Sequence, residues 1–281
     1  MRTILTITAL LLTMLVSGLT SATPAARPQR IISMNLCTDQ LLILLADPAN
    51  IVSVSYLSLE EHSSFVAPQV RAAGYIVNHS LPEEVLPLDP DLIVTGQFMH
   101  QQETRLLRQL GKQVETFPVI NSLADARQNI HRMAELIGEP ARGRQLIDEM
   151  DRRLALLTAR SPVHKLPAVT WHPHGFTQGR NTLMDELMTL AGWHNIARDF
   201  GIEGYRQLQL EELLAGQPQL LILSEYAPGT RSIGQSQLRH PVLKKLLRDS
   251  SSLVLDSRLL ICGGPMNLVA LEALVEARNE R

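Results

Sequence analysis

Short apolar runs alternate with longer stretches of helical periodicity along most of the chain. Apolar runs bounded by turn residues predict four buried strands in the first half, at residues 30–33, 51–55, 92–95 and 113–117. Apolar positions at helical spacing predict helices between and after them, at residues 38–45, 102–110 and 123–137. We expect Thr38 or Asp39 to cap the first helix. Short strands that alternate with helices pair in parallel, so the pattern predicts an α/β fold.

The middle of the chain carries one long helical pattern. Gly138 and Pro140 interrupt the preceding helix, and apolar residues then recur at close to helical spacing as far as Leu157. Charged residues fill the other face. The expected helix at 139–160 is roughly 30 Å long at a rise of about 1.5 Å per residue. Its length and its charged face favour a bridge between two lobes over a core helix of one domain.

The second half of the chain repeats the order of the first. It predicts strands at 168–172, 220–224 and 252–255, and helices at 182–191, 210–214, 241–248 and 268–278. Residues 83–94 and 211–222 both read two glutamates, two apolar residues, three further residues, a proline and an apolar strand. Residues 41–51 and 186–196 match more loosely. The repetition predicts two similar parallel-sheet lobes, 30–137 and 165–281, joined by one helix within 138–162.

The first thirty residues differ from the rest. Arg2 precedes an almost wholly apolar stretch at residues 4–19, and small residues, Ser21 and Ala22 first, follow it. This order is typical of a secretory signal peptide, so we expect cleavage near Ala22 and removal of residues 1–22. The stretch is shorter than the roughly 20 apolar residues that span a bilayer, and no later segment supplies such a run. We therefore expect an exported, soluble protein.

The two cysteines, Cys37 and Cys262, narrow the compartment. Neither follows the apolar run directly, so the lipid-acceptor cysteine of a lipoprotein is missing, which favours the periplasm. In an oxidising space the two thiols either form a disulfide or remain free and buried, and their spacing leaves both open. The formal net charge of −2 and the scattered basic residues argue against nucleic-acid binding.

A resemblance to a known family is carried by the central helix and by four segments, 30–35, 88–94, 110–114 and 175–179. On these segments the chain resembles the periplasmic binding proteins for iron–siderophores and vitamin B12, and the likeness covers residues 30–277. It implies two lobes joined by one rigid helix, with a small-molecule metal chelate held between them. It also implies delivery of the chelate to the permease dimer of an ABC importer in the inner membrane. We expect a monomer with no catalytic residues, no resident cofactor and no metal site of its own.

Two glutamates at matching places in the repeat are candidates for docking. In the family that this chain resembles, one glutamate on each lobe forms a salt bridge to arginines of the permease, and Glu83 and Glu211 hold the matching positions. Acidic residues at equal places on two similar lobes also fit a two-fold symmetric partner. The alternative is that these residues, with Glu84 and Glu212, are solvated first-turn charges of short helices.

Ligands of parallel α/β lobes bind at the carboxyl ends of the strands, which gives candidate contacts by position. Aromatic faces suit a large planar or apolar chelate, with a few polar groups to orient it. The candidates in the first half are Asn35, Cys37, Tyr56 and Gln97. The candidates in the second half are Trp171, His172, His174, Phe176, Glu225 and Tyr226. Trp171 lies within a predicted strand and is equally compatible with a place in the core.

Three alternatives stay open on the sequence. If His172 and His174 lie on a strand they share one face, and with other histidines they could hold a bare zinc or manganese ion. Haem, with Tyr56 or a histidine as axial ligand, is the second. A secreted hydrolase is the third, although no nucleophile elbow, P-loop or dinucleotide-binding motif is present. The expected function is binding and delivery of a chelate.

Overall fold

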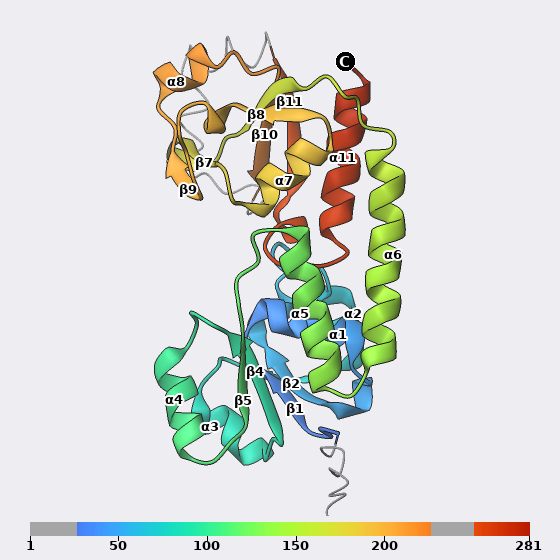
Figure 1. The fold of residues 1–281 in the computed structure, drawn as a ribbon. Helices are drawn as coiled ribbons and strands as arrows, with labels where there is room; N and C mark the ends of the chain where they lie inside the picture. The colour runs from blue at the N-terminus through green and yellow to red at the C-terminus, as the bar shows by residue number, and fades with distance from the viewer. Residues whose placement is uncertain (1–26, 226–249) are drawn as a thin grey trace, which may run out of the picture.

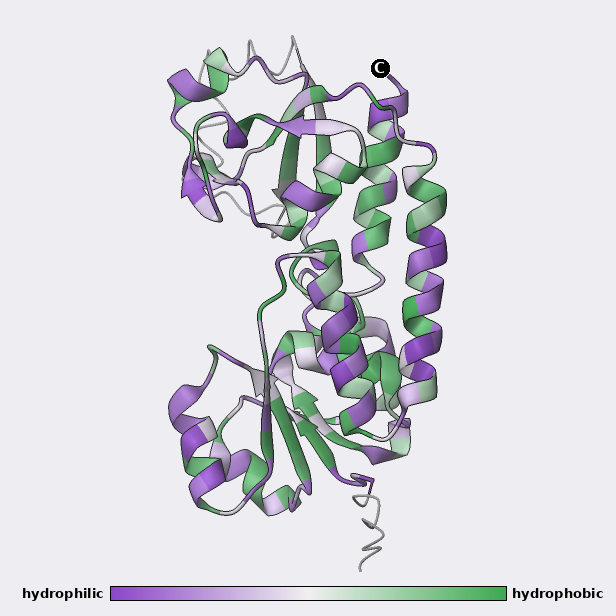
Figure 2. Ribbon diagram, viewed as in Figure 1, coloured by the Kyte–Doolittle hydropathy of each residue, from purple (hydrophilic) through white to green (hydrophobic). Residues whose placement is uncertain are grey.

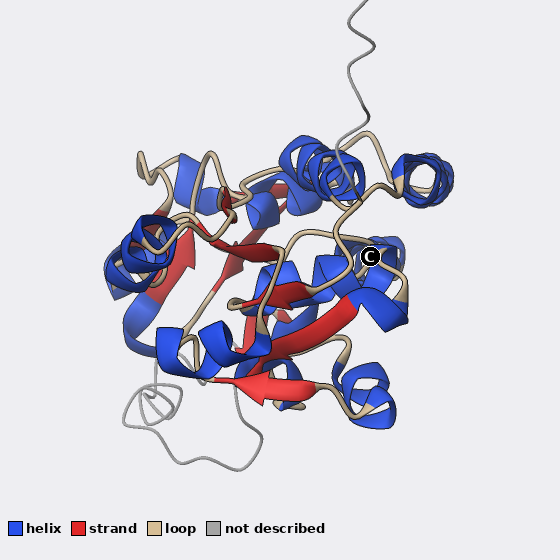
Figure 3. Ribbon diagram, turned by 90° about the horizontal axis from the view of Figure 1, so that it is seen from below, coloured by secondary structure: helices blue, strands red, loops and turns tan. Residues whose placement is uncertain are grey.

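Two parallel sheets organise the residues described by the computed structural model, 27–225 and 250–281. The long helix α6, Pro140–Thr158, runs along one side of both lobes (Figure 1). The N-lobe, which precedes α6 in the sequence, holds one sheet, and the C-lobe, which follows α6, holds the other. Helices lie on either side of the strands when the molecule is viewed along its length (Figure 3). The predicted architecture of two α/β lobes and one connecting helix is confirmed.

Five parallel strands form the sheet of the N-lobe, in the order β3-β2-β1-β4-β5. They are β1 Ile31–Ser33, β2 Ile51–Ser55, β3 Ile76–Asn78, β4 Leu92–Gly96 and β5 Val114–Phe117. The helices of this lobe are α1 Leu36–Leu45, α2 Ala67–Ala73, α3 Pro82–Val85, α4 Gln101–Gln109 and α5 Leu123–Leu136. Successive side chains of a strand point to opposite faces, so Ile31 joins the core beside α1 while Ile32 packs with Val85 and Leu107. The strands are accordingly apolar, and the outer sides of α4 and α6 are mostly polar (Figure 2).

Four parallel strands form the sheet of the C-lobe, in the order β11-β10-β6-β8. They are β6 Leu166–Thr170, β8 Trp193–Asn195, β10 Leu220–Glu225 and β11 Ser251–Asp256. Among the described residues, the helices of this lobe are α7 Leu183–Leu190, α8 Leu210–Ala215 and α11 Asn267–Asn279. A separate antiparallel pair is formed by β7 Phe176–Gln178 and β9 Tyr205–Gln207. The hydrophobic pattern did not predict this pair, because β9 is exposed along its whole length.

The two repeated segments occupy equivalent places in the two sheets. Residues 83–94 contain most of α3 and the start of β4, and residues 211–222 contain most of α8 and the start of β10. Each of these strands pairs with the first strand of its lobe: Leu92 lies opposite Ile31 in β1, and Leu220 lies opposite Ala168 in β6. The repeat in the sequence therefore corresponds to a repeat in the structure.

The connecting helix α6 Pro140–Thr158 packs on α5 of the N-lobe and on α11 of the C-lobe. Its first residue is Pro140, a residue type that is common at the first position of a helix. Its buried side is marked by Gly143, Met150 and Leu157, spaced by two helical turns. A Cβ at Gly143 would lie 2.4 Å from the Cβ of Ala134 on α5, so glycine is needed where the two helices touch. The helix therefore rests on both lobes along one narrow apolar stripe.

The expected cap of the first helix is wrong. Asn35 caps α1, because its side-chain oxygen accepts a hydrogen bond from the backbone amide of Cys37 at 3.0 Å. Thr38 lies inside the helix, where its hydroxyl donates to the carbonyl oxygen of Asn35 at 2.9 Å. Asp39 is fully buried. Ser, Thr, Asn and Asp are all common caps, so residue type alone did not select among neighbours.

Other expectations concern boundaries and segments. The strand expected at 168–172 ends at Thr170. The helix expected at 241–248 and the signal peptide expected at 1–22 lie outside the described residues. The lobe limits 30–137 and 165–281 stay predictions. No helix within 27–225 or 250–281 is both long enough and apolar enough to cross a membrane.

Candidate ligand-binding site

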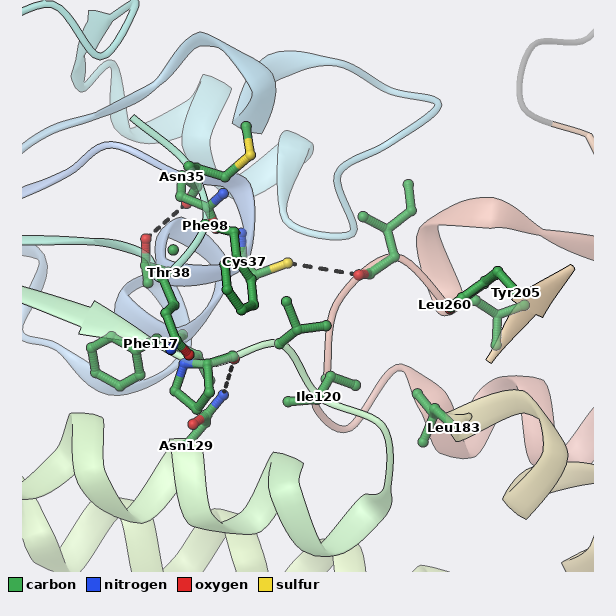
Figure 4. A pocket seen from close by; sticks show the side chains of 18 residues that line it. Asn35, Cys37, Thr38, Phe98, Phe117, Ile120, Asn129, Leu183, Tyr205 and Leu260 are labelled. Atoms are coloured by element: carbon green, nitrogen blue, oxygen red, sulfur yellow. Dashed lines mark hydrogen bonds between the residues drawn. The ribbon is translucent and has the colours of Figure 1, made fainter. Parts of the chain in front are cut away.

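A cavity of about 220 Å³ lies between the two lobes (Figure 4). The N-lobe contributes residues that follow β1, β4 and β5, and the C-lobe contributes residues of α7, β9 and the segment before α11. The carboxyl ends of parallel strands are where ligands bind in such lobes. The lining residues are Asn35, Cys37, Thr38, Leu41, Gly96, Gln97, Phe98, Met99, Phe117, Pro118, Val119, Ile120, Asn129, Leu183, Tyr205, Leu260, Ile261 and Gly263.

Asn35 is held in the cavity wall by the backbone around it. Its side-chain oxygen is used by the amide of Cys37, which leaves its Nδ2 group on the side of Gly96. A Cβ at Gly96 would lie 3.3 Å from that Nδ2, so the glycine lets the end of β4 approach Asn35 closely. The carboxyl ends of two neighbouring strands thereby present an amide donor toward the cavity.

The cavity is uncharged among the described residues, because no arginine, lysine, histidine, aspartate or glutamate lines it. Its polar side chains include the amides of Asn35, Gln97 and Asn129. Phe98 of the N-lobe and Tyr205 of the C-lobe are 65% and 69% exposed, respectively, and they add aromatic surface from the two lobes. Burying a charge in such surroundings is costly, whereas an apolar body with a few hydrogen-bonding groups is not. The cavity therefore suits the uncharged part of a ligand.

A disulfide joins the two lobes beside this cavity. Cys37 lies at the start of α1 in the N-lobe, and Cys262 lies between β11 and α11 in the C-lobe. Their sulfur atoms are bonded and their Cα atoms are 5.2 Å apart. The sequence left both a disulfide and free thiols open, and the structure contains the disulfide. Because the bond spans the lobes, it limits how far they separate at the cavity.

Further contacts hold the lobes together near the disulfide. A carboxylate oxygen of Glu186 on α7 accepts a hydrogen bond from the backbone amide of Leu123, at the start of α5, at 2.7 Å. The hydroxyl of Ser257 after β11 donates to the carbonyl oxygen of His62 at 2.8 Å. Each of these contacts joins a segment of the C-lobe to a segment of the N-lobe, so they add to the connection made by α6. We therefore expect relative motion of the lobes to be a small rotation.

Three of the predicted ligand contacts line the cavity: Asn35, Cys37 and Gln97. Tyr56 does not. It lies on the short 3₁₀ helix that follows β2, where its ring stacks on that of His79 with centroids 5.1 Å apart. This aromatic pair is exposed at the carboxyl ends of β2 and β3 but lies outside the cavity lining.

Trp171 needs a correction, because the structure places it in the core and not in the cavity. Its side chain is only 7% exposed and belongs to the apolar cluster of the C-lobe with Val169, Leu208 and Leu213. It follows β6 directly, so its side chain continues the alternation of the strand and faces inward with Val169. The core interpretation that the sequence left open is the correct one.

His172 and His174 do not share a strand face. β6 ends before them, and His172 precedes a short 3₁₀ helix in which His174 has a left-handed backbone, with φ of 62°. Burial lowers the pKa of His172, which favours its neutral form. No group of three or more His, Cys, Asp or Glu residues within the described ranges could hold a metal ion. Phe176 begins β7 and is half-exposed, outside the cavity lining.

The last two predicted ligand contacts are Glu225 and Tyr226. β10 ends at Glu225, and Tyr226 lies outside the described residues. Both stay predictions as ligand contacts.

Sequence reasoning missed the cavity-lining residues that follow β5 and the one on β9. The segment Phe117 to Ile120 satisfies the same strand-end rule that selected Asn35 and Gln97, and applying the rule to the fourth strand would have found it. Tyr205 had no comparable signal, because it lies on a short, exposed strand without alternation.

Glu83 and Glu211 are exposed on α3 and α8, and neither side chain forms a hydrogen bond or ion pair with the described residues. Their neighbours behave differently. Glu84 and Glu212 accept hydrogen bonds from backbone amides before the first turn of their own helices, at 2.5 Å and 2.8 Å. Both α3 and α8 lie on the side of the molecule opposite α6 (Figure 1). The unengaged glutamate of each pair is thus the first one in both lobes.

The family model for periplasmic binding proteins matches residues 31–246. The chain belongs to this family. A cobalamin-binding protein of Halobacterium salinarum is 26% identical over 207 residues, which cover 72% of this chain and 56% of that protein. The match with this family member therefore spans little more than half of the relative's length.

Two solved members with similar architecture support the fold. The periplasmic heme-binding protein RhuT from Roseiflexus sp. RS-1, in its apo form, superposes with a TM-score of 0.71 at 22% identity, covering 89% of this chain and 99% of RhuT. The periplasmic vitamin B12-binding protein BtuF of Vibrio cholerae superposes with a TM-score of 0.68 at 22% identity, covering 90% of this chain and 98% of BtuF. At this level of identity the similarity shows that the two-lobed fold is shared.

Proposed function

We propose that this protein is the substrate-binding protein of an ABC importer for a metal chelate, either an iron–siderophore or a corrinoid such as vitamin B12. It acts in the periplasm, after removal of residues 1–22, and passes the chelate to the permease dimer of the inner membrane. Its function is binding and delivery, with no catalytic residue and no resident cofactor. The protein works as a monomer.

The observation that carries this proposal is the cavity between the lobes, with its uncharged and mainly apolar lining. A chelate hides its metal inside an organic shell, so the receptor needs shape and a few hydrogen bonds instead of metal ligands. The cobalamin-binding relative supports a corrinoid in particular. The cavity of about 220 Å³ is smaller than most ligand pockets, which measure roughly 300–1,000 Å³. A small rotation of the lobes about α6 enlarges it and admits the chelate.

The rival ligands have less support. A bare zinc or manganese ion lacks a ligand cluster within the described residues. Haem has Tyr56 and His79 available at the strand ends, yet this stacked pair lies outside the cavity lining. A hydrolase would need an activated nucleophile, and the disulfide removes Cys37 from that role.

The test is a binding panel on the purified protein by calorimetry and native mass spectrometry. The panel contains cobalamin, cobinamide, a ferric hydroxamate, a ferric catecholate, haem and zinc chloride. We expect submicromolar binding of one chelate class and no binding of zinc. Zinc binding without any chelate binding would refute the proposal.

We also propose that Glu83 and Glu211 dock on the permease. Their exposure and lack of partners support this role, whereas Glu84 and Glu212 are engaged within their helices. Reversing both charges, with Glu83→Arg and Glu211→Arg, is expected to abolish uptake by cells and to leave chelate affinity unchanged. Glu149→Arg with Glu276→Arg is the matched control, because these exposed glutamates lie on α6 and α11 and change the net charge equally. Normal uptake by the Glu83 and Glu211 variant would contradict the docking role.

A further inference from the structure

A second cavity adjoins the first on the outside of the N-lobe. It has a volume of about 490 Å³ and lies between α4 and β5, the edge strand of the sheet. Gln97 and Met99 line both cavities, so the two lie next to each other at the carboxyl end of β4. We call this second cavity the arginine groove, because Arg105 and Arg108 line it together with Thr104 and Thr116.

The arginine groove offers positive charge without a carboxylate to balance it. No acidic residue lines it, and Arg105 forms no hydrogen bond or ion pair with the described residues. Arg108 donates from Nε and Nη2 only to the carbonyl oxygen of Val114, at 3.2 and 2.8 Å, which keeps its charge uncompensated. Glu115, the neighbour of Thr116, is paired with Arg132 at 2.9 Å on the other face of β5.

A buried hydroxyl adds a second indication of a ligand. Thr104 lines the groove and is only 5% exposed, and its buried Oγ1 has no hydrogen-bond partner among the described residues. Buried hydroxyls normally have a hydrogen-bond partner, because leaving one without a partner loses its hydration and returns nothing. Two guanidinium groups and a free hydroxyl on one helix face are the groups that bind carboxylate or phosphate oxygens.

We propose that the arginine groove is an anion subsite of the ligand-binding site. The uncharged body of the chelate lies in the cavity between the lobes, and one acidic substituent, a carboxylate or a phosphate, extends past Gln97 and Met99 to Arg105 and Arg108. The inference rests on the proposed function for the identity of the cargo. It adds that the preferred chelate has an uncharged body and an anionic arm.

The subsite is testable without knowing the cargo. Phenylglyoxal modifies accessible guanidinium groups, and mass spectrometry measures the rate at each arginine. Inorganic phosphate at about 20 mM is expected to slow modification of Arg105 several-fold, compared with chloride at equal ionic strength. Arg152, exposed on α6 and without a partner there, is the control and should be unaffected. Equal protection of Arg105 and Arg152 would overturn the proposal, whatever the chelate panel shows.

Paired probes then identify the source of the anion. Haem and its dimethyl ester differ in their carboxylates, and cobalamin and cobinamide differ in the phosphate-bearing loop. The Arg105→Gln variant is expected to weaken the acid-bearing member roughly five-fold and to leave the other member unchanged, as for one partly exposed ion pair. Arg105→Lys should restore most of the preference, and Arg152→Gln should change neither. If the chelate bound most tightly has no acidic group, or if Arg105→Gln weakens both members equally, the proposal is wrong.

Discussion

The N-lobe and the C-lobe share a common frame. The strand order β2-β1-β4-β5 of the N-lobe corresponds to β8-β6-β10-β11 of the C-lobe. The helices that follow the last strands, α5 and α11, both pack on α6. The repeated segment before β4 and β10 therefore marks equivalent positions in two copies of one plan. The two lobes differ in the strands that lie outside this common frame.

The N-lobe adds a fifth strand, β3, beside β2, whereas the C-lobe adds the antiparallel pair β7 and β9 outside its sheet. This pair brings Tyr205 to the cavity, and no residue of β3 lines it. The lesson is that the common frame supplies the strand ends, while the element unique to the C-lobe supplies an aromatic wall.

The lobes also bury an aspartate on their first helix in two different ways. In the C-lobe, Asp185 of α7 accepts two hydrogen bonds from the guanidinium of Arg198, both at 2.6 Å. In the N-lobe, Asp39 of α1 accepts hydrogen bonds from the amide and hydroxyl of Ser55 and has no cation beside it. Burial therefore raises the pKa of Asp39 to about 7, against the lowering effect of the serine hydrogen bonds.

The largest expected effect comes from removing the disulfide that joins the two lobes. Replacing both cysteines, with Cys37→Ser and Cys262→Ser, frees a loop closed over 225 residues of sequence. We expect a loss of about 3–4 kcal/mol in the free energy of unfolding, because the bond restricts the unfolded chain. Urea unfolding followed by circular dichroism measures this, and the wild type with a reductant is the control. An unchanged midpoint would mean that α6 and the other contacts alone unite the lobes.

The next effect breaks the buried ion pair of the C-lobe. Arg198→Met leaves the carboxylate of Asp185 buried without its cation, and we expect a loss of about 2–3 kcal/mol in unfolding free energy. Combining it with Asp185→Asn should recover at least half of the loss, because the unpaired charge is then gone. A double variant as unstable as the single one would show that Arg198 contributes by packing alone.

A smaller, pH-dependent effect is expected at Asp39 in the N-lobe. Below pH 4 the native and unfolded states both hold its proton; as the pH rises toward 7, the unfolded chain releases the proton while the folded protein keeps it. The wild type therefore loses stability over this window, and Asp39→Asn does not. The variant's advantage in unfolding free energy should grow by on the order of 2 kcal/mol between pH 5 and 6.5 in urea unfolding. Asp148→Asn, exposed on α6, is the control, and a parallel pH profile for Asp39→Asn would contradict the shifted pKa.

The smallest effect concerns the pair of strands that only the C-lobe has. Tyr205→Ala removes an aromatic side chain from the cavity, and we expect about ten-fold weaker chelate binding with little change in melting temperature. Phe176→Ala is the matched change on the partner strand, where the ring is exposed but outside the cavity lining, and it should leave affinity unchanged. Equal losses in both variants would mean that Phe176 contacts the chelate, as the sequence first suggested.

Features that depend on local periodicity could be predicted from the sequence. Local periodicity predicted the central helix, the strands that begin within the repeated segments and two residues that line the cavity, Asn35 and Gln97, because buried strands and amphipathic helices leave a regular pattern of apolar residues. Short exposed elements leave no such pattern, which is why β9 and Tyr205 were missed. Trp171 was misplaced because strand-end position does not say which way a side chain faces.

By itself, the sequence determined that the chain repeats one α/β plan, that one long helix connects the copies, and that the first glutamate of each repeat is equivalent. Only the tertiary structure decided that Cys37 meets Cys262, that Tyr205 reaches the cavity, and that Arg105 stands beside it without a carboxylate. The physical reason is one of range. Strand and helix periodicity depends on residues that are close in the sequence, so it can be recognised from the sequence alone. A site between lobes depends on which distant segments come together in space.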